Sequence, residues 1–545
     1  MKRIFALALI CGVFAFSLAS AGVLHVPGDY ALIHDAVQAC SAGDTVLVAA
    51  GNYYDCTHPT EGPESTPACV IMKTGVTLRG AGSNLTIIDA QQNGRGIFIE
   101  EVANCRVENL QVTGAYAQIY GAGILIREVD STVEVNDVRV TGCTDGGVIC
   151  INNSHATLRR LTLDNNEAKQ GGGLAIEEFS SPTVIECLID NNTAPSGAGL
   201  FMRHDCAPVI TDCVIINNII SSNWGNGGGI SIQGSTPTIT GCEIKNNTTY
   251  GYGGGVAFLD GSAGLMEDCL IQDNIAAYTY SQGGGIATST SNPVFRRLVI
   301  VGNSASGYYA EGGGLDISFA PAPSLENCTI VGNSTSENGF GGGMAIQWGA
   351  DPVIDKCIIS GSTAGQGIYC SSSTPVISCT NIFGNAGGDD LCGTDDGGNF
   401  SADPLFCGTE GVEYRLTSAS PCAPGNHPDG LCDDQLIGAL GAGCNLTPAP
   451  LPGLEDLVLG NHPNPFNPST TIFFELPQAG PASLRIYDLA GRLIQERSWD
   501  DLPQGRSEFQ WNGLDRQGRA LSSGVYLYRL DTRDHSLSRR MSLIR

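Results

Sequence analysis

A glycine cluster followed by an apolar residue returns along most of this 545-residue chain. The last glycines of the clusters are Gly96, Gly123, Gly147, Gly173, Gly199, Gly229, Gly255, Gly285, Gly314, Gly343 and Gly367. Successive members lie 24 to 30 residues apart, a period typical of a solenoid. Such a chain buries its core by stacking similar units, because no single unit can bury its apolar residues alone.

Each repeat contains three short stretches in which apolar and polar residues alternate. In one repeat they are residues 227–232, 235–240 and 242–247, separated by Gly, Pro and Asn. Alternation is the period of a strand, and helical spacing is absent. Three strands would close one triangular coil, and coils would stack at about 4.8 Å. The pattern predicts an all-β parallel β-helix with three strands per rung and about a dozen rungs.

Cysteine exchanges with Leu and Val at the start of the third strand. This ladder position is occupied by Leu110, Val138, Leu161, Cys187, Cys213, Cys242, Cys269, Leu298, Cys328 and Cys357. We interpret these thiols as small buried hydrophobic groups, with disulfides between rungs as the alternative. Cys150 and Cys370 are also placed in the core. The better disulfide candidates lie in the less regular ends, with their pairing open: Cys40, Cys56, Cys69, Cys392, Cys407, Cys422, Cys432 and Cys444.

An asparagine follows the third strand in seven repeats. The positions are Asn165, Asn191, Asn217, Asn246, Asn274, Asn303 and Asn333. A row of amides resembles a ligand set, but Asn also tolerates left-handed backbone angles and can stack its amide along a coil. We therefore expect corner residues.

The first 21 residues have the pattern of a secretory signal peptide. Two basic residues precede an apolar run over 4–18, and small residues follow at 19–21. The run is shorter than the ~20 residues that span a bilayer, and no later run is apolar for long enough. We expect no transmembrane segment in the mature chain, and a secreted or outer-surface location.

Charge divides the chain into an acidic part and a neutral part. The whole sequence has 28 basic and 55 acidic residues, a net charge of −27. Residues 453–545 hold 11 of each and no Cys, so the excess lies in the repeats. This acidity excludes nucleic acid as a partner, and it would repel anionic pectin unless Ca²⁺ bridged the two. A Pro-rich linker is expected at 446–452, between a solenoid domain at 22–445 and a domain at 453–545.

The segments 29–37 and 42–53 resemble the N-terminal cap of the pectin lyase-like superfamily, in which a short amphipathic helix plugs the first coil. The repeats resemble right-handed parallel β-helix repeats, and residues 403–440 resemble the closing coils. The resemblance implies the fold and leaves the function open.

The C-terminal segment has short strand-like runs of a small β-sandwich. Residues 463–472, 486–492 and 523–528 resemble the flagellar-hook-capping-like Ig domain and the type A C-terminal sorting domain of type IX secretion. The resemblance implies export across an outer membrane, with the secretion machinery as a partner. A plain accessory Ig module is the alternative.

No familiar catalytic signature of the polysaccharide lyases or hydrolases of this fold is present. Aligning the repeats on their last glycine brings five charged residues to one face: Glu177, Glu178, Arg203, His204 and Asp205. They are our candidate catalytic residues, because carboxylates and His can share a proton network. A row of exposed salt bridges is the alternative.

A second grouping is aromatic. Trp224, Tyr250, Tyr280 and Tyr309 occupy one position on four consecutive repeats, where they would span about 15 Å. Such a strip suits the apolar faces of sugar rings, and the alternative is an aromatic ladder that stabilises the turns. Small outward residues such as Ser231, Ala257, Ala287 and Ala345 indicate a smooth sheet face, which favours binding or structure over catalysis.

We therefore expect a secreted or cell-surface protein that binds a glycan or extracellular matrix. The alternative is a polysaccharide lyase or glycoside hydrolase with a non-standard active site. No cofactor motif is evident, and Ca²⁺ is the one cation left open.

Overall fold

The computed structural model describes residues 21–60, 66–117, 123–408 and 414–444, and residues 458–543 with gaps at 463–467, 477–478, 489–491, 504, 518, 523 and 533–535. The chain divides into two compact units, one ending at Thr447 and the other spanning Pro448–Arg545. The expected linker, and the expected signal peptide apart from Ala21, lie outside the described residues.

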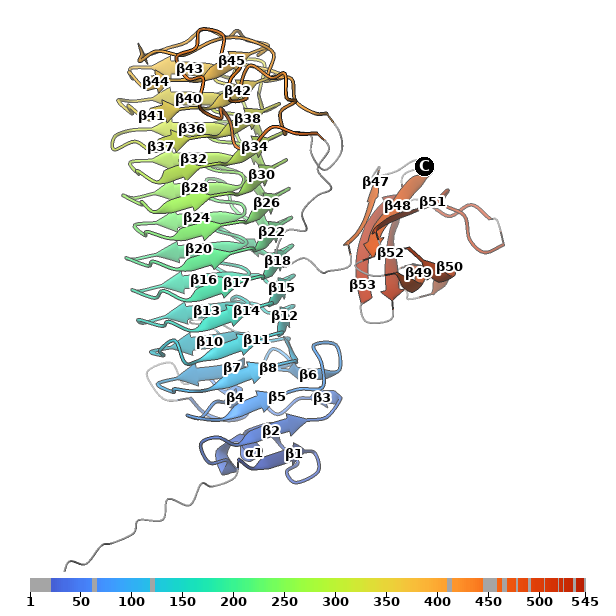
Figure 1. Ribbon diagram of the computed structural model, residues 1–545. Helices are drawn as coiled ribbons and strands as arrows, with labels where there is room; N and C mark the ends of the chain where they lie inside the picture. The colour runs from blue at the N-terminus through green and yellow to red at the C-terminus, as the bar shows by residue number, and fades with distance from the viewer. Residues whose placement is uncertain are drawn as a thin grey trace, which may run out of the picture. The chain divides into compact units, whose positions relative to one another are not determined.

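The first unit is a parallel β-solenoid, as predicted. Each coil consists of one strand of sheet C, then one of sheet A and then one of sheet B. The middle coils add a short strand of sheet D before the next coil begins. Figure 1 shows sheets C and A as adjacent columns, from β4 and β5 near the N-terminus to β43 and β44.

Sheet C has 12 strands: β4 (Ala68–Ile71), β7 (Arg95–Glu100), β10 (Ile124–Arg127), β13 (Val148–Ile151), β16 (Leu174–Glu177), β20 (Leu200–Arg203), β24 (Ile230–Gln233), β28 (Val256–Leu259), β32 (Ile286–Ser289), β36 (Leu315–Ser318), β40 (Met344–Gln347) and β43 (Ile368–Ser371).

Sheet A has 15 strands: β1 (Val23–Val26), β2 (Thr45–Val48), β5 (Thr77–Arg79), β8 (Arg106–Glu108), β11 (Glu134–Asn136), β14 (Thr157–Arg159), β17 (Thr183–Ile185), β21 (Val209–Thr211), β25 (Thr238–Thr240), β29 (Leu265–Glu267), β33 (Val294–Arg296), β37 (Ser324–Glu326), β41 (Val353–Asp355), β44 (Val376–Ser378) and β46 (Thr394–Asp395).

Sheet B has 13 strands: β3 (Gly51–Tyr53), β6 (Thr86–Asp89), β9 (Gln111–Thr113), β12 (Arg139–Thr141), β15 (Thr162–Asp164), β18 (Leu188–Asp190), β22 (Val214–Ile216), β26 (Glu243–Lys245), β30 (Leu270–Gln272), β34 (Val299–Val301), β38 (Thr329–Val331), β42 (Ile358–Ser360) and β45 (Asn381–Phe383). Sheet D has six: β19 (Thr193–Ala194), β23 (Ile219–Ile220), β27 (Thr248–Thr249), β31 (Ile275–Ala277), β35 (Ser304–Ser306) and β39 (Ser334–Thr335).

The second unit is all-β and antiparallel. One sheet pairs β47 (Val458–His462), β48 (Thr470–Leu476) and β51 (Gly505–Trp511). The other pairs β50 (Leu493–Leu502), β49 (Gly480–Asp488), β52 (Gly524–Thr532) and β53 (Ser536–Leu543). Their inner residues form one buried cluster that includes Phe474, Trp511 and Tyr528.

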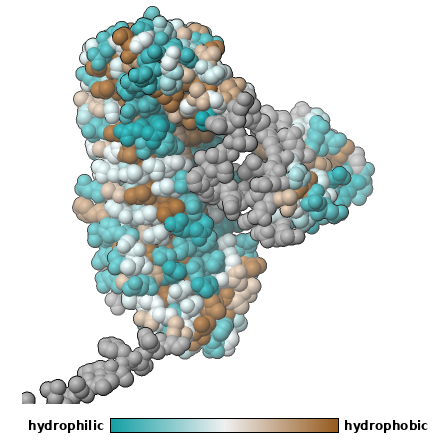
Figure 2. Space-filling view, in the orientation of Figure 1, coloured by the Kyte–Doolittle hydropathy of each residue, from teal (hydrophilic) through white to brown (hydrophobic). Residues whose placement is uncertain are grey.

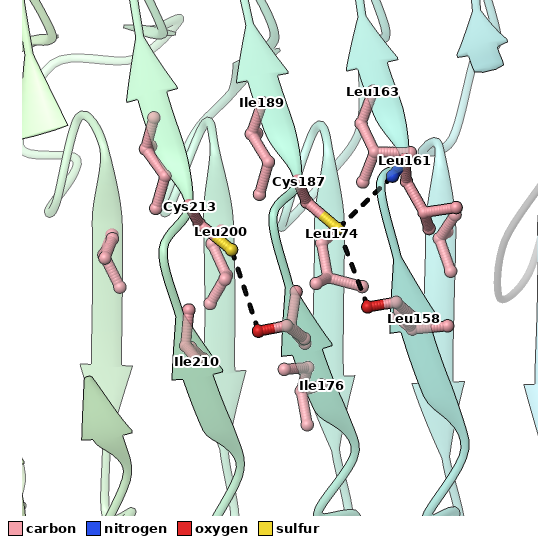
Figure 3. Packing of buried hydrophobic residues seen from close by; sticks show 14 of the residues in the cluster. Leu158, Leu161, Leu163, Leu174, Ile176, Cys187, Ile189, Leu200, Ile210 and Cys213 are labelled. Carbon is pink, nitrogen blue, oxygen red and sulfur yellow. Dashed lines mark hydrogen bonds between the residues drawn. The ribbon is translucent and has the colours of Figure 1, made fainter. Parts of the chain in front are cut away.

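The cysteine ladder lies in the solenoid core. Every member of the ladder position is at most 2 % exposed, as the exchange of Cys with Leu and Val predicts. In Figure 3 the thiol of Cys187 lies between the backbone carbonyl of Leu158, to which it donates, and the N–H of Leu161, from which it accepts. Burial raises the pKa of the Cys187 thiol well above its usual value, so this side chain is an uncharged core group.

Four disulfides join Cys56 to Cys69, Cys370 to Cys392, Cys379 to Cys432 and Cys407 to Cys444. They lie toward the two ends of the solenoid. The predictions for three cysteines are wrong: Cys370 is bonded rather than a free core residue, whereas Cys40 and Cys422 are free and buried. Cys379, which our sequence analysis did not select, is bonded to Cys432 of residues 403–440, which we call the closing segment.

The turn after sheet B uses two adjacent residues where the sequence predicted one asparagine with two functions. The first residue adopts the left-handed backbone angles, and the second forms the amide ladder. Asn217 and Asn246 have positive φ, at 56° and 54°. The residues after them, Asn218 and Asn247, are fully buried, and the Nδ2 of Asn218 donates to the Oδ1 of Asn247 at 3.0 Å. This ladder runs through Asn166, Asn192, Asn218, Asn247, Asn274, Asn303 and Asn333.

The two ends of the solenoid are covered by other segments. The helix α1 (Ile33–Ala39) buries Ile33, Ala36 and Val37 at the first coil, where the cap resemblance implies a helix. At the other end, the closing segment folds back along sheet B. The N–H of Ala439 donates to Thr329 Oγ1, and its side chain packs with Val299 and Val301.

Candidate functional site

The outer face of sheet C is not an open groove. Ser231, Ala257, Ala287 and Ala345 point outward from this sheet, yet each is at most 2 % exposed. A glycine turn before each sheet C strand from β16 to β40 lies against that face: a Cβ on Gly197, whose φ is 55°, would come within 2.8 Å of Phe201 Cβ. The outward small residues therefore reflect close packing by the preceding turn, and an accessible site must lie elsewhere.

The candidate catalytic residues stack as the alignment predicts, but they fall into two layers. Glu177 ends β16 and Arg203 ends β20, and the two are register partners. Arg203 Nη2 and Nε donate to Glu177 Oε2 at 2.7 and 2.9 Å, and the Glu177 side chain is 5 % exposed. These two residues form a largely buried ion pair, so neither is free to transfer a proton to a ligand.

Glu178, His204 and Asp205 lie beyond the strand ends, in the turn from sheet C to sheet A. All three have positive φ, between 53° and 61°, which turns the chain sharply around this corner. None of their side chains forms a hydrogen bond or ion pair with another described residue. The structure therefore leaves two carboxylates and one imidazole of this corner available to a ligand.

These three residues line an open pocket of about 940 Å³. Four consecutive turns between sheets C and A build it, after β10, β13, β16 and β20. Its lining residues are Glu128, Val129, Asp130, Asn152, Asn153, His155, Glu178, Phe179, His204 and Asp205. We call it the corner pocket.

Phe179 gives the corner pocket an apolar surface. Its side chain is 60 % exposed, although a ring of this size is normally buried. Its backbone φ is 62°, a conformation that costs free energy for a bulky residue. Burial of the ring does not offset this cost, which indicates a role for the ring at the surface.

The remaining polar side chains of the pocket are partly held in place. Asn152 Nδ2 donates to Glu128 Oε1 at 3.4 Å. The Thr132 hydroxyl and N–H both donate to Asp130 Oδ1, which lowers the pKa of that carboxyl. His155 and Asn153 lie within hydrogen-bonding distance at 3.2 Å. Four carboxylates and no Lys or Arg line the pocket, so its field favours uncharged or cationic ligands.

The aromatic grouping forms a stack rather than a flat strip. Trp224 and Tyr280 stack with ring centroids 5.9 Å apart, and Tyr280 and Tyr309 stack at 5.0 Å with 8° between their planes. Tyr278 and Tyr308 contact the stack edge-on. Tyr250 is not part of it and packs on a small apolar cluster that includes Ile220. Because neighbouring rings cover the faces of Tyr280, the stack favours the ladder interpretation over a sugar platform.

Among the described residues, no group of three or more His, Cys, Asp or Glu side chains is placed to hold a metal ion. No described helix is long and apolar enough to cross a membrane.

The sequence alignment missed the aromatic member of the pocket. It compared the fourth and fifth residues after the last glycine, and Phe179 is the sixth. An exposed Phe among polar corner residues is a signal that one further column of the alignment would have brought out.

Comparisons with known proteins agree with the two units. The family described as "Right handed beta helix region" matches residues 74–227 and 211–319, and "FlgD Ig-like domain" matches residues 466–535. The solenoid is thus a right-handed β-helix, and a FlgD Ig-like domain stands at the C-terminus. A search of curated proteins found no match.

Solved structures with similarity include dimeric latent PorU from Porphyromonas gingivalis, at 20% identity and a TM-score of 0.15 over 16% of this chain and 9% of PorU. The chain thus spans about a tenth of PorU. Pectate lyase Pel9A is 12% identical, with a TM-score of 0.35 over 78% of this chain and 97% of Pel9A. The A-module of mannuronan C-5 epimerase AlgE4 from Azotobacter vinelandii is 16% identical, with a TM-score of 0.34 over 68% and 94%.

Proposed function

We propose that this chain is an exported β-helix protein that binds a polysaccharide without anionic sugars in the corner pocket. The observation that carries the proposal is the exposed Phe179 ring beside the unpaired polar groups of Glu178, His204 and Asp205. Sugar rings present apolar C–H faces and polar hydroxyl edges, so they need both kinds of surface in one place.

The chemistry of the lining supports a sugar rather than an apolar ligand. Carboxylates and amides are acceptors and donors for hydroxyl groups, and an aromatic face attracts C–H groups through its negative quadrupole. The pocket is also shallow and open to solvent, which suits a polymer that passes through it rather than a small molecule enclosed by it.

Charge narrows the class of polysaccharide. The pocket holds four carboxylates without a basic residue, on a chain with a net charge of −27. A chain of uronates would be repelled, whereas uncharged sugars and amino sugars would not. Adding Ca²⁺ to the binding assay tests whether a cation can reverse this preference.

The test is calorimetric titration with three oligosaccharide types: cello-oligosaccharides, chitosan oligosaccharides and oligogalacturonates. We expect binding of an uncharged or amine-bearing type and no binding of the uronate. Phe179→Ala should weaken binding at least about tenfold, as loss of a central aromatic contact does. Tyr308→Ala, which removes an exposed ring outside the pocket, is the matched control. Equal affinities of Phe179→Ala and the unaltered chain would overturn the proposal.

A second candidate function is hydrolysis of the bound glycan; lysis by β-elimination would need a uronate, which the charge of the pocket disfavours. Hydrolysis is favoured by Glu178 and Asp205, unpaired carboxylates on adjacent turns, where rungs about 4.8 Å apart approach the spacing of glycosidase pairs. New reducing ends, lost in Glu178→Gln while binding remains, would identify an enzyme. Binding without product leaves the binding function alone.

We further propose that the C-terminal unit directs export. The support is its separate, compact Ig-like fold and the sequence resemblance of 463–472, 486–492 and 523–528 to sorting domains. A reporter fused to residues 1–21 and 453–545 should reach the cell exterior in a host with type IX secretion. Unchanged localisation of the same fusion without 453–545 would refute the sorting role.

A further inference from the structure

A second pair of exposed aromatic side chains stands on the same corner of the solenoid as the pocket. Phe319 follows β36 and Trp348 follows β40, each directly after the last residue of the strand. Their rings stack with centroids 6.1 Å apart and 16° between the planes, and they are 46 % and 56 % exposed. In the described part of the chain, neither ring stacks on any other.

Both residues belong to one column that runs along the solenoid. The column consists of the first residue after each sheet C strand from β7 to β43: Glu101, Glu128, Asn152, Glu178, His204, Gly234, Asp260, Thr290, Phe319, Trp348 and Ser372. Every member has positive φ, between 48° and 64°. We call it the corner column; the corner pocket occupies its rungs from Glu128 to His204.

Phe319 and Trp348 are energetically unfavourable residues at this position, because both have positive φ. Left-handed backbone angles suit Gly and Asn, and the other members are small, polar or charged. A bulky ring in this conformation is strained, and at about half exposure its packing recovers little of the cost. Strain that packing does not explain points to function. Trp224 also has positive φ, 72°, and similar exposure, but its ring contacts two others, Tyr278 and Tyr280, as part of the aromatic stack.

Most column residues between the two aromatic sites have short side chains. Phe179 and Phe319 are five rungs apart, which corresponds to about 24 Å. Beyond His204 and Asp205, the intervening members Gly234, Asp260 and Thr290 have short side chains or none. On the face of the molecule seen in Figure 2, hydrophobic residues form separate patches among hydrophilic ones.

We propose that the corner column is a binding track for a linear polysaccharide without anionic sugars, which lies along the solenoid axis and contacts Phe179 at one site and the Phe319–Trp348 pair at another. This rests on the glycan binding proposed for the corner pocket and adds a second subsite and a minimum ligand length. Glu101, Glu128, Glu178 and Asp260 give the column the same charge preference as the pocket, because it holds no Lys or Arg.

Other occupants fit these observations less well. An extended peptide would pair with a free sheet edge, whereas the solenoid strands are paired along the axis and leave edges only at the two ends. A second copy of the chain would need about 800 Å² on each partner, more than separated rings supply.

Ligand length provides the test, with cello- and chitosan oligomers as trimers and as chains long enough to span both sites. Trp348→Gly should weaken binding of the long oligomer about tenfold, because one of two linked contacts is lost, and leave trimer binding unchanged. Phe179→Ala should weaken both. Trp224→Ala, which removes an equally exposed ring outside the column, should change neither.

The thermal stability of Trp348→Gly distinguishes a binding role of Trp348 from a structural role. Glycine suits the left-handed position, so Trp348→Gly should raise the Tm while it lowers affinity. In a Trp224→Phe background, tryptophan fluorescence should respond to the long oligomer and not to the trimer. The response should disappear when Trp348 is also replaced by Gly, which leaves only Trp499 and Trp511 of the C-terminal unit. If Trp348→Gly binds the long oligomer like the unaltered chain, the track is refuted while the pocket stands. If no oligomer binds, the function of the pocket fails as well.

Discussion

Asp316 shows how strongly burial in the solenoid can shift the pKa of a single side chain. It points outward from β36 but is 1 % exposed, under the same glycine-rich turns that bury the alanines of this face. The Ser318 hydroxyl donates to Asp316 Oδ1 at 2.6 Å, and Gln347 Nε2 donates to Oδ2 at 3.3 Å. Burial raises the pKa of Asp316 to about 8, with a contribution from nearby Glu311, so the carboxyl is protonated at neutral pH.

The first prediction concerns the pH dependence that Asp316 confers. Its folded-state pKa of about 8 lies above the unfolded value of 3.8. The folded state therefore holds one more proton between these values, and the stability from it is complete below pH 3.8 and declines as the pH rises through about 8. The free energy of unfolding should fall by about 1.4 kcal/mol per pH unit in this window.

Asp316→Asn tests this by removing the titrating group. Its Oδ1 can accept from the Ser318 hydroxyl, and its Nδ2 can donate to Gln347 once that amide turns to present Oε1. Urea unfolding at several pH values should show the variant more stable than the unaltered chain at pH 9, with a difference that narrows toward pH 5. Parallel pH profiles of the two proteins would contradict the prediction.

At the scale of the element, the turn after sheet B depends on two adjacent asparagines with different tasks. Asn246 is exposed and adopts φ 54°, whereas Asn247 is buried. Asn247 Nδ2 donates to the carbonyl of Ile215 and to Asn274 Oδ1, and its Oδ1 accepts from the N–H of Asn218. The first residue provides the backbone geometry, and the second satisfies polar groups of three rungs.

We therefore predict opposite tolerances at these neighbours. Asn247→Ala should cost about 3 kcal/mol of stability, because it leaves several buried polar groups without partners. Asn246→Gly should cost less than about 1 kcal/mol, since Gly adopts the same backbone angles. Chemical denaturation of both variants measures this, and similar losses would show that the ladder assignment is wrong.

At the scale of the whole molecule, stability is distributed along the axis. Each coil packs on the coils before and after it. The stability of the solenoid is therefore a sum of contacts between neighbouring coils rather than the product of one central core. The ends need cover, which α1 supplies at one end and the disulfide-bonded closing segment at the other. The C-terminal unit has its own buried cluster and does not share this core.

This separation predicts that a chain of residues 22–447 folds without the second unit. Its Tm should lie within about 2 °C of the solenoid transition of residues 22–545, because domains with independent cores unfold independently. Differential scanning calorimetry of both chains makes the comparison. A large loss of solenoid stability in the shorter chain would show that the two units are energetically coupled.

The amino-acid sequence by itself determined the solenoid, its rung register and the stacking of the candidate residues. The register followed because repeats of similar length bring equivalent positions together: aligning Glu177 with Arg203 on their preceding glycines predicted their pairing. The inward position of Cys187 and Cys242 followed from alternation and from exchange with Leu and Val. These are local properties, repeated many times, and each repeat reinforces the others.

Only the tertiary structure decided which of these positions a ligand can reach. It buried Glu177 in an ion pair with Arg203, covered the outer face of sheet C, and turned the expected aromatic strip into a stack with covered faces. It also selected the disulfide partner of Cys379. Accessibility depends on how turns and the closing segment lie over neighbouring rungs, and such non-local packing has no period that a sequence can display.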